Sequence, residues 1–355
     1  MTSHHLFTGS EPVSAYDEMK DYRDFNLSGH NTFGLSETCS RYVEYETSDE
    51  LRSILLSLTA ADMPLFHIGG GSNILLTRHY AGTMLHSAIK GIEATDNGDS
   101  WLLRCGSGET WDDVVAYAVT HGMYGIENLS LIPGEVGASA VQNIGAYGRE
   151  ACDVIDEIEA LRIADASPAV FRNSDCGYGY RQSRFKTEWK GEYAITHVTY
   201  RLSKTFTPYI DYGNIRDCLD KRGIASPTAA DIRAAIIDIR QSKLPDPATE
   251  GNAGSFFMNP VVEKAVYEKI AASYPDIPHY PAAPGHVKLP AGWLIDRCGW
   301  KGRAMSRAGV HDRQALVLVN KGGATGADIM ALAAAVQHDV KQTFGIELHP
   351  EVIYL

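Results

Sequence analysis

Several features are scarce or missing in this sequence, and each absence argues against a class of protein. The six cysteines lie far apart and form no CxxC pair, which argues against a zinc ribbon, a thioredoxin-like redox site or a disulfide framework. No run of eighteen apolar residues occurs, so we expect no membrane-spanning helix. The net charge is −12, with 32 Lys and Arg against 44 Asp and Glu, which disfavours nucleic-acid binding because phosphate neutralisation needs a basic surface.

The remaining composition is typical of a globular protein with more than one domain. The 355 residues exceed one comfortable core, and 44% of them are hydrophobic. The first thirty residues carry acidic side chains and no apolar run, so they do not resemble a signal peptide. His4 and His5 are better interpreted as polar terminal residues than as metal ligands. We therefore expect a cytoplasmic protein with reduced thiols, no metal, no membrane association and no nucleic-acid partner.

Local patterns predict an α/β protein with one glycine-rich part up to about residue 240 and a second part after it. Alternating or β-branched residues predict strands in TMLHSA (83–88), SWLLRCGSG (100–108), VIDEIEALRI (154–163), EYAITHVTYRL (192–202) and the terminal IELHPEVIYL (346–355). Helices are expected after Ser48, after a capping box of Thr110 and Asp113, and after one of Thr228 and Asp231. A last helix places four apolar residues on one face: Ile329, Leu332, Val336 and Val340.

Two glycine-rich stretches suggest a ligand that contains phosphate. HIGGGSN (67–73) follows an apolar strand, and successive backbone N–H groups in such a loop can face an anion. It fits neither a Rossmann fingerprint, because Ile74 stands at the third glycine position, nor a Walker A motif. IPGEVGASAVQNIGAYG (132–148) has no clear period and places polar side chains between four glycines. A bound dinucleotide and purely structural loops are both open at this point.

Three polar residues outside these loops are candidates for chemistry. Ser255 lies in GNAGSFFMNP (251–260), between glycines that permit close approach and two phenylalanines suited to a core. Arg181, in YRQS, could bind a carboxylate through two N–H groups, and Glu351 lies near the end of the chain. Each also has an ordinary explanation: a turn serine, a salt-bridged surface arginine and an exposed strand glutamate.

Five motifs in order resemble the family of UDP-N-acetylenolpyruvoylglucosamine reductases (MurB), across about residues 31–353. They are GGGSN (69–73), IPGEVGASAVQNIGAYG (132–148), YRQSRFK (180–186), GNAGSFFMNP (251–260) and LHPEV (348–352). The resemblance implies an α/β (α+β) fold with an FAD-binding region of the vanillyl-alcohol-oxidase (PCMH) type. The domains expected are an N-terminal extension (1–30), the FAD-binding region in two subdomains (31–205), a linker with an α/β substrate-binding domain (206–345), and a C-terminal strand that returns to the active site (346–355).

The resemblance also implies a reaction. NADPH would reduce bound FAD, and the flavin would reduce UDP-N-acetylglucosamine enolpyruvate to UDP-N-acetylmuramate, a cytoplasmic step of peptidoglycan precursor synthesis carried out by a monomer. The FAD is expected to be non-covalent, because Gly70, Gly71 and Ser72 stand where related oxidases often carry a flavin-linked histidine. A flavin oxidase of the same superfamily is the alternative, and it would not need Ser255 and Glu351 together.

The resemblance assigns roles to individual residues. Ser255 would protonate the intermediate, while Arg181 and Glu351 would stabilise the enolate, with Glu351 acting as a protonated donor whose pKa burial raises. The implied FAD-binding residues are Gly69, Gly70, Gly71, Ser72, Asn73, Pro133, Gly134, Gly137, Ala138, Ser139, Gln142, Asn143, Gly145 and Ala146. The implied substrate-binding residues are Tyr212, Lys243, Asn259, Tyr280, Lys288, Lys301 and Gln314.

Three positions refine the comparison with the family. Tyr212, in DYGNI, resembles the tyrosine that covers the substrate in one of the two subtypes, so that subtype is expected here. Met258 and Ile353 stand where members of the family often carry basic residues. The apolar side chain of Ile353 is expected to remove one contact to the flavin.

Overall fold

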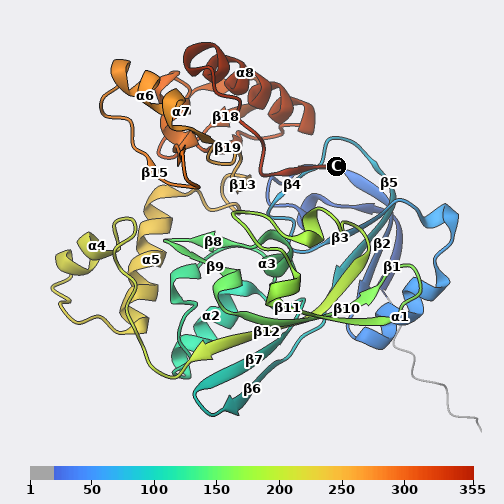
Figure 1. Cartoon of the computed structure of the whole chain (residues 1–355). Coiled ribbons are helices and arrows are strands. Elements are labelled where there is room, and N and C mark those ends of the chain that lie inside the picture. Colours follow the sequence, from blue (N-terminus) through green and yellow to red (C-terminus); the bar gives the residue numbers. More distant parts are fainter. Residues whose placement is uncertain (1–19) are drawn as a thin grey trace, which may run out of the picture.

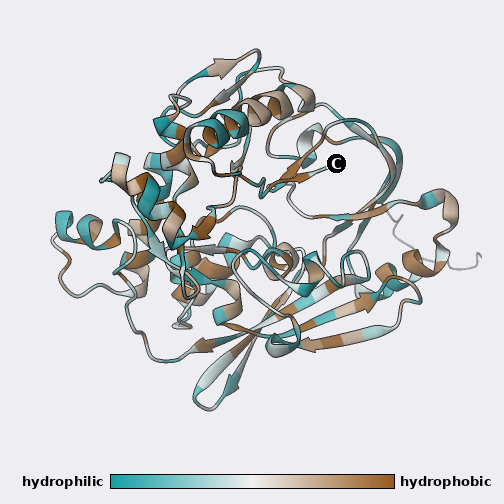
Figure 2. Cartoon of the chain, turned by 45° about the horizontal axis from the view of Figure 1, so that its top comes forward, coloured by the Kyte–Doolittle hydropathy of each residue, from teal (hydrophilic) through white to brown (hydrophobic). Residues whose placement is uncertain are grey.

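The computed structural model describes residues 20–355, so the predictions on residues 1–19, including His4 and His5, lie outside the described part. Figure 1 shows a lower body built on two sheets and an upper lobe formed by the C-terminal third of the chain, with α4 and α5 at one side. Hydrophobic residues gather on the strands and on the inward faces of the helices (Figure 2).

The first sheet has the strand order β1-β2-β5-β3. Its strands are β1 (Lys20–Asn26), β2 (Thr38–Tyr45), β3 (Leu65–Ile68) and β5 (Tyr80–Ser87), and only β1 runs antiparallel to its neighbour. Because β1 pairs with β2, residues Lys20–Asn26 of the expected N-terminal extension (1–30) form part of this sheet. Helix α1 (Ser48–Ser57) covers it with buried Leu51 and Ile54. The cap of α1 is Thr47 rather than Ser48, since the Thr47 side chain accepts the Glu50 N–H at 3.1 Å.

The second sheet is antiparallel, with the order β11-β10-β12-β7-β6. Its strands are β6 (Ile92–Asn97), β7 (Ser100–Gly106), β10 (Ile155–Arg162), β11 (Pro168–Arg172) and β12 (Tyr193–Ser203). Helices α2 (Trp111–Thr120) and α3 (Val136–Gln142) share its core, where Trp111 packs edge-on against Tyr200. The predicted capping box of α2 is wrong, because the Thr110 side chain makes no cap hydrogen bond. Helix α3 lies in the glycine-rich stretch where no period was visible.

Helices α4 (Ile215–Lys221) and α5 (Ala229–Lys243) connect the body to the C-terminal lobe and form a small core of their own. Ile232 and Ile236 of α5 are fully buried, one turn apart. The capping box predicted for α5 is confirmed: Thr228 and Asp231 exchange side-chain to backbone hydrogen bonds.

The C-terminal lobe contains two small antiparallel sheets and three helices. The first sheet consists of β13 (Asn252–Ser255), β19 (Val317–Asn320), β18 (Ala308–Val310) and β17 (Ala304–Met305), and the second of β14 (Val261–Glu263), β16 (His286–Lys288) and β15 (Tyr280–Pro281). The helices are α6 (Lys264–Ser273), α7 (Ala291–Arg297) and α8 (Gly326–Phe344). The predicted apolar face of α8 is confirmed, because Ile329, Leu332, Val336 and Val340 are fully buried.

The end of the chain returns to the first glycine loop. The terminal strand is shorter than predicted: only β20 (Ile353–Tyr354) is extended, and it pairs in parallel with β4 (Ile74–Leu75). A further short hairpin joins β8 (Gly145–Ala146) and β9 (Arg149–Glu150). One hydrophobic core joins the first sheet to the C-terminal lobe, since Tyr42 and Met84 belong to the same cluster as Phe256 and Leu348. The C-terminal segment is therefore held beside the residues that follow β3.

Candidate active site

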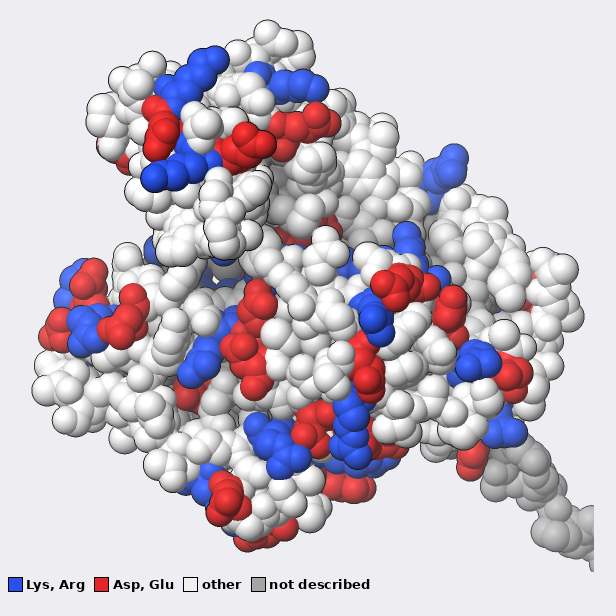
Figure 3. Space-filling view, in the orientation of Figure 1, with Lys and Arg blue, Asp and Glu red and all other residues white. Residues whose placement is uncertain are grey.

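A cavity of about 550 Å³ lies where the two glycine loops meet the C-terminal lobe. Figure 3 shows the surface hollowed between the lobe and the body, on a face where charges of both signs are interspersed. The first loop leaves β3, and the second precedes α3. Residues of both loops line the cavity: 69–73, 133–134, 137–139, 142 and 145. Arg181, Ser255, Asn259 and Glu351 line it as well.

The two glycine loops face each other with bare backbone. A Cβ on Gly70 would lie 3.7 Å from the Cα of Gly134, which itself has a φ of +116°. Gly71 also lines the cavity, and it must be glycine for packing as well, because a Cβ there would lie 2.1 Å from the His30 carbonyl oxygen. Asn143 and Ala146, also predicted to bind the cofactor, do not line the cavity. The buried Asn143 amide instead donates to Gly179 and Glu150.

The backbone around Ser255 places the serine side chain at the cavity. Gly251 passes so close to Phe33 that a Cβ would lie 2.2 Å from its carbonyl oxygen. Gly254 has a φ of +65°, where glycine is favoured, and this bend interrupts the pairing of β13 with β19. Phe256 and Phe257 are buried and anchor the strand. The serine side chain is exposed, and no group within residues 20–355 hydrogen-bonds its hydroxyl.

Arg181 and Glu351 form an ion pair at the same cavity, although they are far apart in the sequence. The Arg181 Nε lies 3.0 Å from Glu351 Oε1, and both side chains are mostly buried. The guanidinium also donates to the Asn143 carbonyl oxygen at 3.2 Å. Gly145 makes room for it, because a Cβ on Gly145 would lie 2.8 Å from Arg181 Nη1. Glu351 is tied to the serine strand by its N–H, which donates to the Phe256 carbonyl at 2.9 Å.

The environment of Glu351 favours its neutral form. Burial raises the pKa of Glu351 above its ordinary value, and the positive charges of Arg181 and Lys186 oppose that shift without cancelling it. A buried carboxyl with a raised pKa keeps its proton to a higher pH than an exposed glutamate does, and in that form it can donate a hydrogen bond. The position therefore suits a proton-bearing group beside a developing negative charge.

Some of the predicted substrate-binding residues gather around Tyr180, next to Arg181. Asn259 Nδ2 lies 3.4 Å from the Tyr180 hydroxyl, and its Oδ1 accepts the Ala291 N–H at 2.9 Å. The Lys288 ammonium lies 4.5 Å from the centre of the Tyr180 ring. Burial lowers the pKa of Lys288, so it is partly removed from bulk water. These contacts bring a cation, an amide and an aromatic ring to one side of the Arg181–Glu351 pair.

Two exposed tyrosines of the predicted set stack on each other. The rings of Tyr212 and Tyr280 have centroids 6.1 Å apart and planes inclined by 28°. Both side chains are about 40% exposed and neither lines the cavity. Tyr212 comes from the loop before α4 and Tyr280 from β15, so the pair spans the gap between the linker and the C-terminal lobe.

Of the seven predicted substrate residues only Asn259 lines the cavity, and within residues 20–355 Lys243, Lys301 and Gln314 also make no hydrogen bond or ion pair with Tyr180. Lys243 is exposed at the end of α5, and Lys301 pairs with Asp296 at 3.2 Å. The Gln314 side chain accepts the Leu316 N–H at 3.4 Å. The structure therefore separates these residues from the cluster that contains Arg181, Ser255 and Glu351.

Sequence reasoning missed Arg240, whose side chain lines the cavity. Its Nε is buried without a hydrogen-bond partner, and the neighbouring Asp112 is bound by Arg233 at 2.6 Å. A signal was present: Arg240 follows Ile232 and Ile236 at intervals of four, on the buried stripe of α5. A charge on an apolar stripe usually needs a partner.

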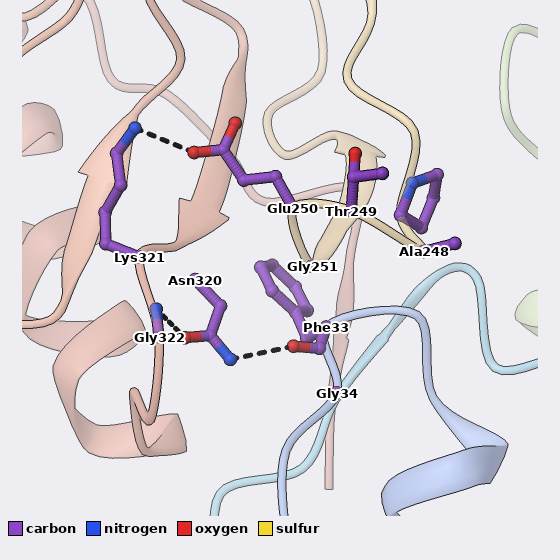
Figure 4. A pocket seen from close by; sticks show the side chains of 10 residues that line it. Phe33, Gly34, Ala248, Thr249, Glu250, Gly251, Asn320, Lys321 and Gly322 are labelled. Carbon is purple, nitrogen blue, oxygen red and sulfur yellow. Dashed lines mark hydrogen bonds and ion pairs between the residues drawn. The ribbon is translucent and has the colours of Figure 1, made fainter.

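A second, polar cavity of about 530 Å³ lies between the segment before β13 and the loop after β19 (Figure 4). Glu250 and Lys321 pair beside it at 2.7 Å, and Asn320 donates to the Phe33 carbonyl at 2.9 Å. Its polar groups are thus satisfied within the protein. Within residues 20–355, no helix is long and apolar enough to cross a membrane, and no three His, Cys, Asp or Glu side chains are grouped as metal ligands.

The fold and the site define a class, a flavin-dependent oxidoreductase. Residues 39–172 match the model of an FAD-binding domain, which includes both glycine loops. Residues 246–355 match the C-terminal domain of UDP-N-acetylenolpyruvoylglucosamine reductase. The expected fold class, an FAD-binding region followed by a C-terminal α/β domain, is thereby confirmed, as is FAD as the cofactor.

The chain belongs to the UDP-N-acetylenolpyruvoylglucosamine reductase (MurB) family. It is 50% identical to the reductase of Bacteroides fragilis strain YCH46, over 93% of this chain and 99% of that one. It is 47% identical to that of Burkholderia ambifaria strain AMMD, over 93% and 95%. The crystal structure of the Thermus caldophilus enzyme shares the fold, with a TM-score of 0.64, 22% identity, and coverage of 95% of this chain and 98% of that one.

The cavity walls fit FAD. Four side chains that line it carry a buried polar atom without a partner among the described residues: Tyr45, His67, Gln142 and Arg240. A ligand with a pyrophosphate, hydroxyl groups and a polar ring can meet such groups, whereas an apolar ligand would leave them unsatisfied. Ile353 also lines the cavity, and its side chain contributes only apolar contact there. Arg240 brings a positive charge to the same cavity.

Proposed function

We propose that this protein reduces the enolpyruvyl ether of UDP-N-acetylglucosamine to UDP-N-acetylmuramate, with NADPH as reductant and FAD bound non-covalently. The observation that carries the proposal is that Arg181, Ser255 and Glu351 all line the cavity that the glycine loops line. These residues come from three separate segments of the chain. A flavin oxidase that uses oxygen would not need this combination beside a UDP-sugar site.

The three residues suit the charge that develops during reduction of an enol ether next to a carboxylate. Bound FAD supplies hydride transfer from the nicotinamide to the terminal carbon of the enolpyruvyl group. Negative charge then builds on the substrate carboxylate as an enolate. The permanently charged Arg181 and, when it carries a proton, the carboxyl of Glu351 can stabilise this charge by hydrogen bonds, an effect that is large between mostly buried groups.

Ser255 is the proposed proton donor to the neighbouring carbon. Its hydroxyl faces the cavity without a hydrogen bond from residues 20–355, so it is free to bond a substrate atom. A hydroxyl is a weak acid in water, but it is adequate beside a basic enolate carbon when held within hydrogen-bond reach. The serine then recovers a proton from solvent, which completes the addition of hydride and proton across the double bond.

The UDP-sugar is proposed to bind on the Tyr180 side of the site. Asn259 and Lys288 lie beside Tyr180 and would contact the UDP-sugar, and Tyr212 with Tyr280 would cover the bound nucleotide. Lys243, Lys301 and Gln314 do not line the cavity, so their contribution requires the longer reach of the diphosphate or movement of the lobe. We place the reaction in the cytoplasm, in the synthesis of peptidoglycan precursors, and propose that the enzyme acts as a monomer without nucleic acid or membrane.

An anaerobic half-reaction experiment tests this function. The purified yellow protein is bleached with NADPH, and UDP-N-acetylglucosamine enolpyruvate is then added without oxygen. Rapid return of the yellow colour, with UDP-N-acetylmuramate as product, is the expected result. If the flavin stays bleached until air is admitted, the protein is an oxidase and the roles of Ser255, Arg181 and Glu351 are withdrawn.

A further inference from the structure

The main chain of Arg181 adopts a conformation that arginine rarely takes. Reciprocal hydrogen bonds between Gly179 and Gln182, of 3.1 and 2.9 Å, close a turn with Tyr180 and Arg181 at its tip. Arg181 has a φ of +55°, in the left-handed region. Glycine or asparagine usually fills the second tip position of such a turn, because a Cβ there is strained.

The left-handed conformation determines where the guanidinium points. From this turn the side chain reaches the Asn143 carbonyl at 3.2 Å and the Glu351 carboxyl at 3.0 Å. A change of φ toward the ordinary negative range would rotate the side chain away from both partners. Strain of this kind persists only where neighbouring groups hold the residue in place, and it is often found at functional sites.

Lys186 is the side chain that holds the turn from outside. Its Nζ donates to the Arg181 carbonyl oxygen at 2.9 Å. Lys186 ends the short turn Arg184–Lys186, which begins after Ser183, and the buried Ser183 hydroxyl is fixed by a 2.6 Å hydrogen bond to the Val141 carbonyl. The lysine therefore approaches Arg181 from a segment anchored on helix α3.

The environment of Lys186 is unusual for a lysine. Its side chain lines the cavity, and burial lowers its pKa. The Glu351 carboxyl is near enough to oppose this shift, but no carboxylate of residues 20–355 lies within ion-pair distance of the ammonium, and its hydrogen-bond acceptor is the Arg181 carbonyl. A partly buried ammonium that donates to a single backbone carbonyl, instead of pairing with the nearby Glu351 carboxyl, points to a role for this contact at the turn.

We propose that Lys186 is a positioning residue that fixes the left-handed turn at Arg181 and thereby keeps the guanidinium in place for the enolate. The inference rests on the proposed function, because it deepens the role of Arg181 in that reaction. Two other uses of the ammonium, a direct bond to the substrate or one to the cofactor, predict different kinetics and are separated by the experiment.

The experiment compares Lys186→Met, Lys186→Gln and Lys186→Arg in the FAD-loaded enzyme. For Lys186→Met we expect the maximal rate of anaerobic flavin reoxidation by the enolpyruvyl substrate to fall by about 10- to 100-fold, as for the loss of a charge-assisted hydrogen bond. The half-saturating substrate concentration and the rate of flavin reduction by NADPH should change by less than about threefold. Lys186→Arg, which keeps a charged donor, should restore most of the rate. Lys264→Met, in an exposed helix, is the matched control and should equal the unmodified enzyme.

Each other outcome overturns the inference. A rise in the half-saturating substrate concentration at an unchanged maximal rate makes Lys186 a substrate contact, and loss of FAD from Lys186→Met or Lys186→Gln makes it a cofactor contact. Equal rates in all variants show that the bond to Arg181 has no role in positioning. Failure of the proposed function is seen separately, because the unmodified enzyme itself would then not be reoxidised by the substrate.

Discussion

At the scale of the residue, the site separates the group that gives a proton from the groups that hold charge. Ser255 faces the cavity without a bond from residues 20–355, whereas Arg181 and Glu351 are engaged with each other at 3.0 Å. Removing the serine hydroxyl should therefore affect one step and leave the others intact. The same cannot be expected of Arg181, which also bonds the backbone of the second glycine loop at Asn143.

Replacing Ser255 with alanine should slow flavin reoxidation by the enolpyruvyl substrate by about 10²- to 10⁴-fold, because a positioned proton donor contributes that much. Flavin reduction by NADPH should stay normal, since it needs no proton from this residue. Stopped-flow absorbance of the two anaerobic half-reactions measures both rates. Ser255→Cys keeps a proton-bearing group of similar shape and serves as the control. Equal slowing of both half-reactions in Ser255→Ala would remove the serine from this role.

The protonation state of Glu351 should give the oxidative half-reaction a pH dependence. Burial raises the pKa of Glu351, so its neutral form is present below that pKa and is lost as pH rises through it. We expect flavin reoxidation to decline toward alkaline pH in the unmodified enzyme. In Glu351→Gln the rate should be lower by about tenfold or more but flat over the same range, because the amide donor does not titrate. An identical alkaline decline in both proteins would assign the titration to another group.

The same shift has a consequence for stability, with a defined sign. Because the folded protein holds the Glu351 proton more tightly than the unfolded chain does, this residue stabilises the fold most at low pH. Its contribution falls as pH rises from about 4.3, the ordinary value for glutamate, through the raised pKa. Equilibrium unfolding of Glu351→Gln should accordingly show a weaker decline of stability across this interval than the unmodified protein shows.

At the scale of the element, local signals succeeded where the hydrogen bond is also local. The capping box predicted at Thr228 is formed in the structure, where the exposed threonine side chain accepts the backbone N–H of the residue three positions on. The same pattern at Thr110 fails: its chain neighbours Glu109 and Trp111 hydrogen-bond the backbone of the second glycine loop, and the Thr110 side chain makes no cap hydrogen bond.

This contrast gives a matched pair of variants. Thr228→Ala should lower the free energy of unfolding by about 1 kcal/mol, the usual cost of losing an N-cap at an α-helix. Thr110→Ala should change it by less than about 0.5 kcal/mol, because the Thr110 hydroxyl makes no cap bond and the side chain is exposed. Chemical denaturation followed by circular dichroism measures both. Equal losses would mean that Thr110 caps α2 in solution after all.

In the active site too, the sequence predicts which residues take part but not the contacts that depend on the fold. The motifs placed Arg181, Ser255 and Glu351 together by resemblance, and the structure brings them to one cavity. The left-handed backbone of Arg181 could not be foreseen, since arginine seldom adopts it and the bond from Lys186 depends on a turn five residues later. Likewise, the glycine at position 71 is explained by the backbone of residue 30, a contact that no local pattern encodes.

At the scale of the whole molecule, the C-terminal residues pair with the segment that follows the first glycine loop. Four hydrogen bonds link the last three residues to the end of the first glycine loop and the strand after it: Ile353 N to Asn73 O, Leu355 N to Leu75 O, and two from Thr77 to Leu355 O. Asn73 and Ile74 line the cavity, so this pairing stabilises one wall of it. The position of Glu351 depends on the same segment.

Removing residues 353–355 should therefore weaken both the fold and cofactor binding. At about 0.5–1.5 kcal/mol for each of the four hydrogen bonds, the free energy of unfolding should fall by roughly 2–6 kcal/mol. FAD should bind the truncated apoprotein about tenfold more weakly or worse, measured by quenching of flavin fluorescence, because the loop that carries Asn73 loses its support. Tyr354→Phe keeps every one of these backbone bonds and should match the unmodified protein in both measurements. Unchanged FAD affinity after truncation would show that the first glycine loop holds its shape without β20, and that the returning C-terminus serves only to place Glu351.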